Sequence, residues 1–136
     1  MALKYKYDKE ILTAMLIGAD EEDVTVEIPK TVSYYKKLYD VRIGSFEYFP
    51  SIDFSNTKIK KIIISDGITS IENNAFFGCT KLSSIVIPEN ITSIDFGAFQ
   101  DCTGLTSISL PKNITTIGSG TFYNCTSLTS IRIPQD

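Results

Sequence analysis

The chain of 136 residues contains no histidine and no tryptophan. Without histidine it cannot form Ser-His or Cys-His nucleophile–base pairs, and it lacks the imidazole ligands common at zinc sites. The glycine-rich motifs that cradle phosphates and dinucleotides are also absent. The sequence therefore predicts a protein that is not an enzyme and that holds no cofactor and no metal ion.

A basic excess and a long hydrophobic run are missing as well. The chain has 13 basic and 16 acidic residues, whereas a phosphate-binding surface normally carries a basic excess. No apolar run approaches the ~18–20 residues that cross a bilayer. The N-terminal stretch MALKYKYDKE lacks the apolar segment of a secretory signal. We therefore expect no nucleic-acid binding and no membrane insertion, and a cytoplasmic location remains open.

The sequence does contain a repeat. The segment LSSIVIPENITSIDFGAFQDCTG, Leu82 to Gly104, recurs as LTSISLPKNITTIGSGTFYNCTS, Leu105 to Ser127, with no gap and with identity at 12 positions. A fixed period of this length, the step from Leu82 to Leu105, is typical of a solenoid, in which each unit stacks on its copy. Side chains one period apart should therefore lie on top of one another.

Each unit begins with the spacing L-x-x-I-x-I, which alternates with a period of two and predicts a short strand. A proline follows the strand and marks where its hydrogen bonding ends, at Pro88, Pro111 and Pro134. Gly67, Asn90 and Asn113 share one position two residues later, and we expect each of them to have a positive φ. The repeat thus predicts an α/β-type solenoid with a parallel β-sheet along one side.

The return leg of each unit supplies the rest of the core. It carries an isoleucine and then a phenylalanine at fixed positions: Ile71, Ile94, Ile117, Phe76, Phe99 and Phe122. The segments around these phenylalanines are short, so a single helical turn or 3₁₀ piece is expected rather than a full helix. Cys79, Cys102 and Cys125 recur once in each period, which favours a ladder of buried thiols over a zinc site, with a disulfide left open.

The chain divides into three parts by pattern. Residues 1–23 are expected to form a capping β-hairpin, because alternation over residues 4–17 is followed by an acidic turn. Residues 24–58 form an irregular, extended first repeat, and 59–136 form regular repeats, the last incomplete. The extended repeat is rich in aromatic residues, including Tyr34, Tyr35 and Tyr39. These rings either fill a wide first coil or form a binding patch.

The last strand pattern leaves apolar residues at an open edge. Ile131 and Ile133 would be exposed there, and such an edge favours association with another chain. Either the sequence is a piece of a longer protein, which we favour, or two such ends meet. Self-association through this edge is the corresponding prediction.

The repeat also resembles a known family. The pattern I-P-x-N-I-T-x-I-x-x-x-A-F-x-x-C-T-x-L-x-S-I, seen here from Ile87 to Ile108, resembles the BspA-like leucine-rich repeats of the Treponema pallidum class. The resemblance implies a parallel sheet on the concave face and short 3₁₀ or helical turns on the convex side. It also implies a surface or secreted protein of a bacterium or parasitic protist, and adhesion to host matrix or a cell-surface protein. Intracellular members exist, and the family offers no catalytic residues.

In leucine-rich solenoids the outward strand positions usually form the binding surface. In this chain they are Lys61, Ile63, Ser84, Val86, Ser107, Ser109, Ser130 and Arg132. We expect a protein-interaction module, of adhesion type, that binds a protein partner through this surface and through the Tyr34–Tyr39 region. The alternatives are structural spacer repeats of a longer surface protein and an intracellular protein-binding scaffold.

Overall fold

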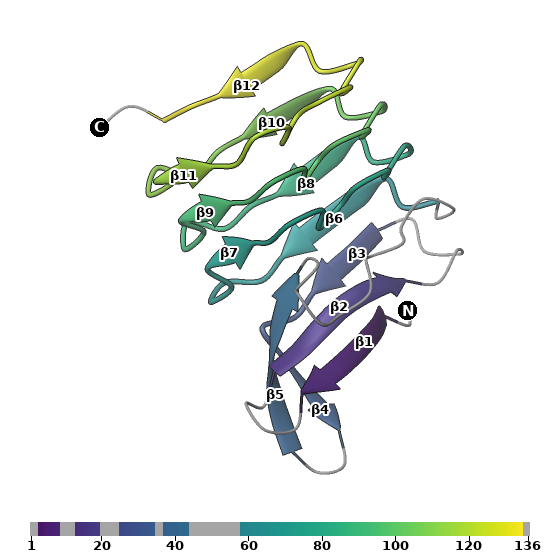
Figure 1. The fold of residues 1–136 in the computed structure, drawn as a ribbon, viewed down its shortest axis with the longest axis vertical. Coiled ribbons are helices and arrows are strands. Elements are labelled where there is room, and N and C mark those ends of the chain that lie inside the picture. Colours follow the sequence, from purple (N-terminus) through teal and green to yellow (C-terminus); the bar gives the residue numbers. More distant parts are fainter. Residues whose placement is uncertain (1–2, 9–12, 20–24, 35–36, 44–57, 135–136) are drawn as a thin grey trace.

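A computed structural model shows a β-solenoid of parallel strands, and it describes residues 3–8, 13–19, 25–34, 37–43 and 58–134. The regular coils stack one above another along the long axis (Figure 1). Each coil has three sides: a strand, a second and shorter strand, and a run of turns. The described residues include no helix long and apolar enough to cross a membrane.

The first side of the solenoid is built from parallel strands. They are β3 (Thr25–Ile28), β6 (Lys61–Ile64), β8 (Ser84–Val86), β10 (Ser107–Ser109) and β12 (Ser130–Arg132). β3, β6 and β8 form one ladder, β10 and β12 form another, and β10 lies next to β8 (Figure 1). Lys61 pairs with Ser84 and Ser107 pairs with Ser130, so residues one period apart lie side by side. The predicted parallel stacking is confirmed.

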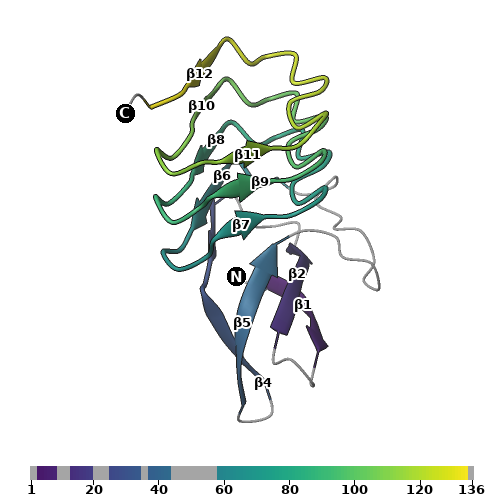
Figure 2. The same ribbon diagram turned by 60° about the vertical axis from the view of Figure 1, so that its left-hand side comes forward.

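The second side continues into the N-terminal part of the chain. β7 (Ser70–Ile71), β9 (Ser93–Ile94) and β11 (Thr116–Ile117) stack in parallel, as Figure 2 shows. The sheet extends from β7 through β5 (Lys37–Ile43) and β2 (Thr13–Ala19) to β1 (Leu3–Asp8), while β4 (Thr31–Tyr34) pairs with β5. β1 and β2 are antiparallel. Their expected capping role, and the three-part division of the chain, remain predictions.

The third side is a run of turns, and the described residues contain no helix, so the predicted helical or 3₁₀ pieces are not found there. Every second N–H closes a turn on the carbonyl three residues earlier, at 3.2 Å: those of Ala75, Phe77 and Cys79. The N–H groups between them donate to carbonyls of the next coil, at 2.8–2.9 Å: those of Asn74, Phe76 and Gly78. A helix directs all its interior N–H groups along its own chain. Here half of them join neighbouring coils instead.

The predicted positive φ is correct at Gly67, where φ is 95°, and wrong at Asn90 and Asn113, which are not among the described residues with positive φ. The corner at Asn90 closes through the Ile91 N–H and the Pro88 carbonyl, 3.2 Å apart, in a turn whose central residues need no positive φ. Positive φ values of 56–73° occur on the turn side instead, at Asn74, Gly97, Gly120, Gly78, Asp101 and Asn124. Those six residues are two positions of the repeat, each seen in three coils.

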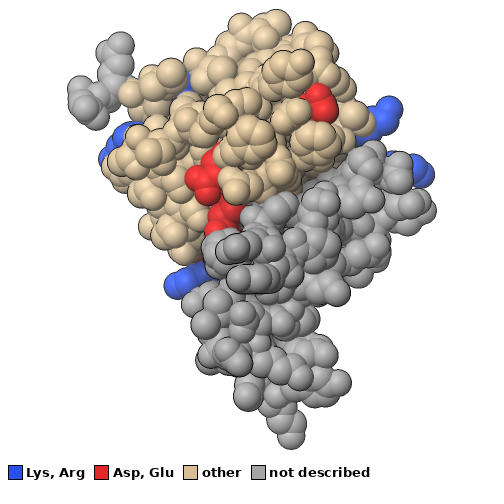
Figure 3. All heavy atoms as spheres, viewed as in Figure 1, with Lys and Arg blue, Asp and Glu red and all other residues tan. Residues whose placement is uncertain are grey.

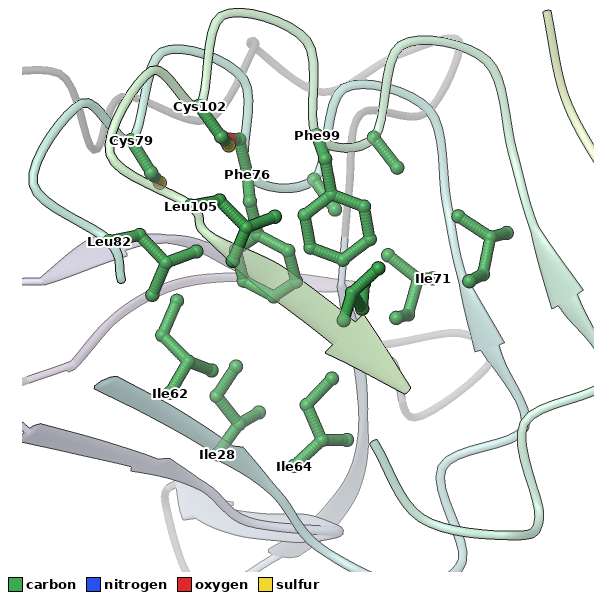
Figure 4. Packing of buried hydrophobic residues seen from close by; sticks show 14 of the residues in the cluster. Ile28, Ile62, Ile64, Ile71, Phe76, Cys79, Leu82, Phe99, Cys102 and Leu105 are labelled. Carbon is green, nitrogen blue, oxygen red and sulfur yellow. The ribbon is translucent and has the colours of Figure 1, made fainter. Parts of the chain in front are cut away.

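The core consists of ladders of identical or similar side chains (Figure 4). Phe76 and Phe99 are fully buried, and their ring centroids are 5.6 Å apart; Phe122 stacks on Phe99 at 5.8 Å. Ile71 and Ile94 are fully buried as well. Burying each such side chain contributes roughly 1.5–3 kcal/mol. The ladders predicted from the repeat therefore form the core.

Burial decreases in the coil nearest the C-terminal end of the described chain. Ile117 is 45% exposed, although Ile71 and Ile94 at the same position are fully buried. Ile131 and Ile133 are 41% and 65% exposed, as the sequence predicts. Association of the protein through these side chains remains a prediction.

The three cysteines are free thiols along the turn side; Cys79 and Cys102 are buried, as the buried-ladder interpretation predicts, and Cys125 is only half-buried. The Cys102 thiol donates a hydrogen bond to the Phe76 carbonyl at 3.2 Å. Hydrogen bonding with the Cys102 thiol, and then burial, raise the pKa of Cys79 well above its ordinary value. Burial raises the pKa of the half-buried Cys125 to about 11. Because these shifts keep the Cys79 and Cys125 thiols protonated near neutral pH, both are poor nucleophiles.

Threonines reinforce the corner before the short strands. The Thr92 N–H and hydroxyl both donate to the Thr69 carbonyl, at 2.9 and 3.4 Å. Thr115 repeats both bonds to the Thr92 carbonyl, at 2.7 and 3.0 Å. Each coil is thereby bonded to the one before it by side chain and backbone together.

Candidate interaction surface

The outward side chains of β3, β6, β8, β10 and β12 form two columns, which together we call the strand face. One column consists of Thr25, Lys61, Ser84, Ser107 and Ser130. The other consists of Glu27, Ile63, Val86, Ser109 and Arg132. The columns form because strand residues two apart point to the same side and coils stack without a shift. All eight candidates predicted from the repeat therefore lie in one surface.

The strand face is accessible along its whole length. Val86 is 46% exposed, Ile63 beside it is half-buried, and the other members of both columns are exposed. The first column offers mainly hydroxyl groups, with one ammonium at Lys61. The second changes from a carboxylate at Glu27, through the apolar pair Ile63 and Val86, to the guanidinium of Arg132. An apolar centre with a polar surround is the usual composition of a protein-binding patch.

The described part of the chain offers no cluster suited to metal binding. It contains no group of three or more Cys, Asp or Glu residues placed to hold an ion. The arrangement on the strand face is suited to hydrogen bonding, apolar contact and charge pairing with another molecule.

The tyrosine candidates are only partly described. Tyr34 is the last residue of β4, and Tyr39 lies in β5, where it pairs with Val32. Tyr35 lies outside the described residues. The structure therefore brings the backbones of Tyr34 and Tyr39 into one antiparallel pair of strands. Both interpretations of these rings, filling of the first coil and a binding patch, remain predictions.

Two members of the strand face were missed at the level of sequence: Thr25 and Glu27. They pair with Lys61 and Ile63 across a longer interval than the regular period of the later coils. The strand pattern VTVEIP was visible, and so was the long interval between Pro29 and Ser65. Combining the two would have extended both columns by one residue.

The turn side carries exposed aromatic rings that the sequence did not single out. Phe77, Phe96 and Tyr123 are 40%, 52% and 67% exposed.

In the space-filling view of Figure 3, basic side chains lie at the margins of the described surface, and acidic ones form a short row and a separate spot. Most of the described surface in that view is uncharged, in keeping with the Ser, Thr and Ile content of the repeats.

The regular coils, each with a strand, a proline-marked corner and a phenylalanine-filled return leg, define a leucine-rich repeat solenoid. Residues 47–136 match the model of the BspA type leucine-rich repeat region, in six copies. Because this match covers more than half of the chain, the chain belongs to the BspA-type leucine-rich repeat family. No curated protein matches the chain in sequence.

Solved structures of bacterial leucine-rich repeat proteins share the fold. A leucine-rich repeat protein from Bacteroides capillosus is similar over 96% of this chain and 93% of its own, with 24% identity and a TM-score of 0.76. The pneumococcal vaccine antigen PcpA is similar over 98% of this chain and 36% of its own, with 20% identity and a TM-score of 0.72.

A leucine-rich cell surface protein from Faecalibacterium prausnitzii is similar over 96% of this chain and 40% of its own, with 23% identity and a TM-score of 0.63. The chain thus spans well under half the length of this protein and of PcpA. At these identities the likeness shows the fold.

Proposed function

We propose that the chain is a non-enzymatic protein-interaction module that binds a protein partner through its strand face. The observation that carries the proposal is the accessible apolar pair of Ile63 and Val86, paired across β6 and β8 at the middle of the face. A few buried apolar or aromatic anchors supply most of the free energy of association, and surrounding polar groups add complementarity. Hydroxyl groups of Ser84 and Ser107 and the cations of Lys61 and Arg132 are placed to do so.

An adhesion role at the cell surface is the setting we propose for this activity. Two proteins with the same fold are a cell surface protein and a vaccine antigen. The family resemblance seen in the repeat pattern points the same way. The partner is then a protein of the host matrix or of a neighbouring cell.

The proposal is tested by placing a charge in the middle of the strand face. Val86→Asp adds a carboxylate where an apolar contact is expected, and Ser127→Asp adds the same carboxylate to an exposed turn position as a control. Binding of each purified variant to a panel of immobilised extracellular-matrix proteins is measured by biolayer interferometry. We expect Val86→Asp to weaken binding at least about tenfold and Ser127→Asp to leave it unchanged, because losing a central anchor costs about 2 kcal/mol or more and about 1.4 kcal/mol corresponds to tenfold.

Both variants should remain folded: Ser127→Asp should melt at the temperature of the wild-type protein, and Val86→Asp only slightly lower, because aspartate is less favourable than valine in a strand. If a matrix protein binds the wild type and Val86→Asp equally, the strand face is not the binding surface. If none of the panel binds, the spacer and intracellular-scaffold alternatives become the stronger interpretations.

A further inference from the structure

The second column of the strand face changes its chemistry along the axis of the solenoid. Glu27 pairs with Ile63, Ile63 pairs with Val86, and Ser109 pairs with Arg132. Val86 and Ser109 are linked by the same step of one period, with β8 next to β10. One line of five side chains therefore runs from an acid, through two apolar groups and a hydroxyl, to a base.

The two terminal charges are too far apart to satisfy each other. Glu27 and Arg132 are separated by four strand intervals, or about 19 Å at the usual spacing of ~4.7–4.9 Å. Both are exposed, and neither forms an ion pair with any residue in the described part of the chain. Each is thus available to an oppositely charged group of a bound molecule.

We propose that the strand face binds an extended segment of a protein partner, laid along the solenoid axis. The segment has a basic side chain over Glu27, one apolar side chain over the pair Ile63 and Val86, and an acidic side chain over Arg132. This inference rests on the proposed protein-binding function and specifies the chemistry of the partner.

The length of the column sets the spacing of the two charges in the partner. An extended chain advances ~3.2–3.4 Å per residue, so about 19 Å corresponds to about six residues. Alternate residues of such a segment point to the same side, so residues one, three, five and seven face the column together. Charge complementarity at both ends fixes the register, and the serine column beside it supplies hydroxyl groups for hydrogen bonds.

The probes are three biotinylated peptides immobilised at high density. The first, Lys-Ser-Val-Ser-Ser-Ser-Asp, matches the proposed pattern, with its valine over Ile63 and Val86 and its fifth residue over Ser109; the second has lysine at both ends and the third aspartate at both ends. We expect the wild-type protein to bind the first peptide about fivefold more tightly than either of the others, because each exposed charge pair changes affinity by up to about fivefold.

This ranking differs from that of unspecific attraction. The protein carries a net charge of −3, so overall charge alone would favour the peptide with two lysines. A shortened version of the first peptide, with fewer residues between its charges, should bind more weakly, because its ends cannot reach both Glu27 and Arg132.

Single charge reversals should change the preferred peptide. Arg132→Glu should make the two-lysine peptide the best ligand, and Glu27→Lys should do the same for the two-aspartate peptide. The matched controls are Lys112→Glu and Asp66→Lys, which reverse charges at exposed positions away from the strand face. The controls should leave the wild-type ranking unchanged.

Several results would overturn the inference. They are a wild-type preference for the two-lysine peptide, equal binding or no binding of all three, and a ranking that the reversals at Glu27 and Arg132 do not change. If Val86→Asp still abolishes binding to a matrix protein in that case, the strand face binds proteins but not in this way. If Val86→Asp has no effect there, the proposed function itself fails.

Discussion

The Cys102 thiol lies 3.2 Å from the Phe76 carbonyl of the preceding coil, and Cys125 repeats the same bond to Phe99 at 3.0 Å. Each bond joins the turn side of one coil to that of the coil before it. A thiol placed in this way donates a hydrogen bond while it is protonated and loses it on ionisation. For Cys125, whose pKa burial raises, the strength of this bond should therefore depend on pH and on folding.

We predict that the stability of the fold decreases between pH 9 and pH 11. Burial raises the pKa of Cys125 from 9.0 to about 11, so above pH 9 the unfolded chain releases a proton that the folded chain retains. The stabilising effect is complete below pH 9 and is lost as the pH rises through 11. Urea unfolding at a series of pH values measures it.

Cys125→Ser is the control for this pH dependence. Its hydroxyl keeps a donor for the Phe99 carbonyl and does not titrate in this range, so the decrease should be smaller than in the wild type. An unchanged decrease would assign the effect to other groups.

At pH 8, thiol reagents should modify the half-buried Cys125 before Cys79 and Cys102.

The stacked phenylalanines should contribute unequally to stability. Phe99 is fully buried between Phe76 and Phe122, so Phe99→Ala should lower the free energy of unfolding by about 3–5 kcal/mol. Phe122→Ala is the matched control: it removes the same ring from the same position one coil later, where burial is only partial. Its loss in urea unfolding should be clearly smaller. Equal losses would show that the two rings are not buried as described.

Gly120 occupies a position that requires a positive φ. Its φ is 66°, and a methyl group there would have no atom closer than 3.9 Å, so Gly120→Ala costs conformational strain rather than a clash. We expect a loss of about 1–2 kcal/mol. Gly120→Asn should lose less, because Asn74 adopts the same conformation two coils earlier. A greater loss for asparagine than for alanine would contradict this explanation.

Hydrogen bonds between coils on the turn side predict that equivalent N–H groups exchange more slowly in an inner coil than in the last one. The N–H groups of Gly97, Phe99 and Asp101 donate to the next coil at 2.9–3.2 Å. The equivalent groups of Gly120, Phe122 and Asn124 have no acceptor within the described residues. In hydrogen exchange followed by NMR, the first set should exchange at least about tenfold more slowly. Equal exchange rates in the two sets would contradict the hydrogen bonds between coils on the turn side.

The repeat predicted the buried side chains of the inner coils but not the exposure of Ile117, which occupies the same position in the last full coil. Ile71 and Ile94, like Phe76 and Phe99, recur at the regular period, and a ladder of equal side chains packs only if the coils stack without a shift. The open edge at Ile131 and Ile133 followed from the same pattern. The recurrence of apolar residues predicts which side chains face the core. Burying those side chains on one another in turn sets the register in which the coils stack.

The backbone of the turn side could not be predicted in the same way. Apolar spacing does not report the direction of an N–H group, so the short segment around Phe76 was expected to be helical. A different signal was present: positions 74, 97 and 120 carry Asn, Gly and Gly, and positions 78, 101 and 124 carry Gly, Asp and Asn. These residue types tolerate positive φ, and their recurrence at both positions disfavours a helix.

The candidate surface was predictable in outline. The outward positions from Lys61 to Arg132 follow from alternation along each strand, and the structure brings them together. Its acidic end was missed because the first interval is longer than the regular period and depends on how an irregular segment folds. The identity of a partner depends on a second molecule, and the repeat pattern of this chain carries no information about that molecule.

The most direct test maps the bound partner onto the solenoid. Hydrogen–deuterium exchange with mass spectrometry compares the free protein with its complex with the tightest-binding matrix protein of the panel. We predict slower exchange in the peptides that contain β6, β8, β10 and β12, with the turn segments 73–79 and 96–102 unchanged. Protection confined to those turn segments would contradict the assignment of binding to the strand face.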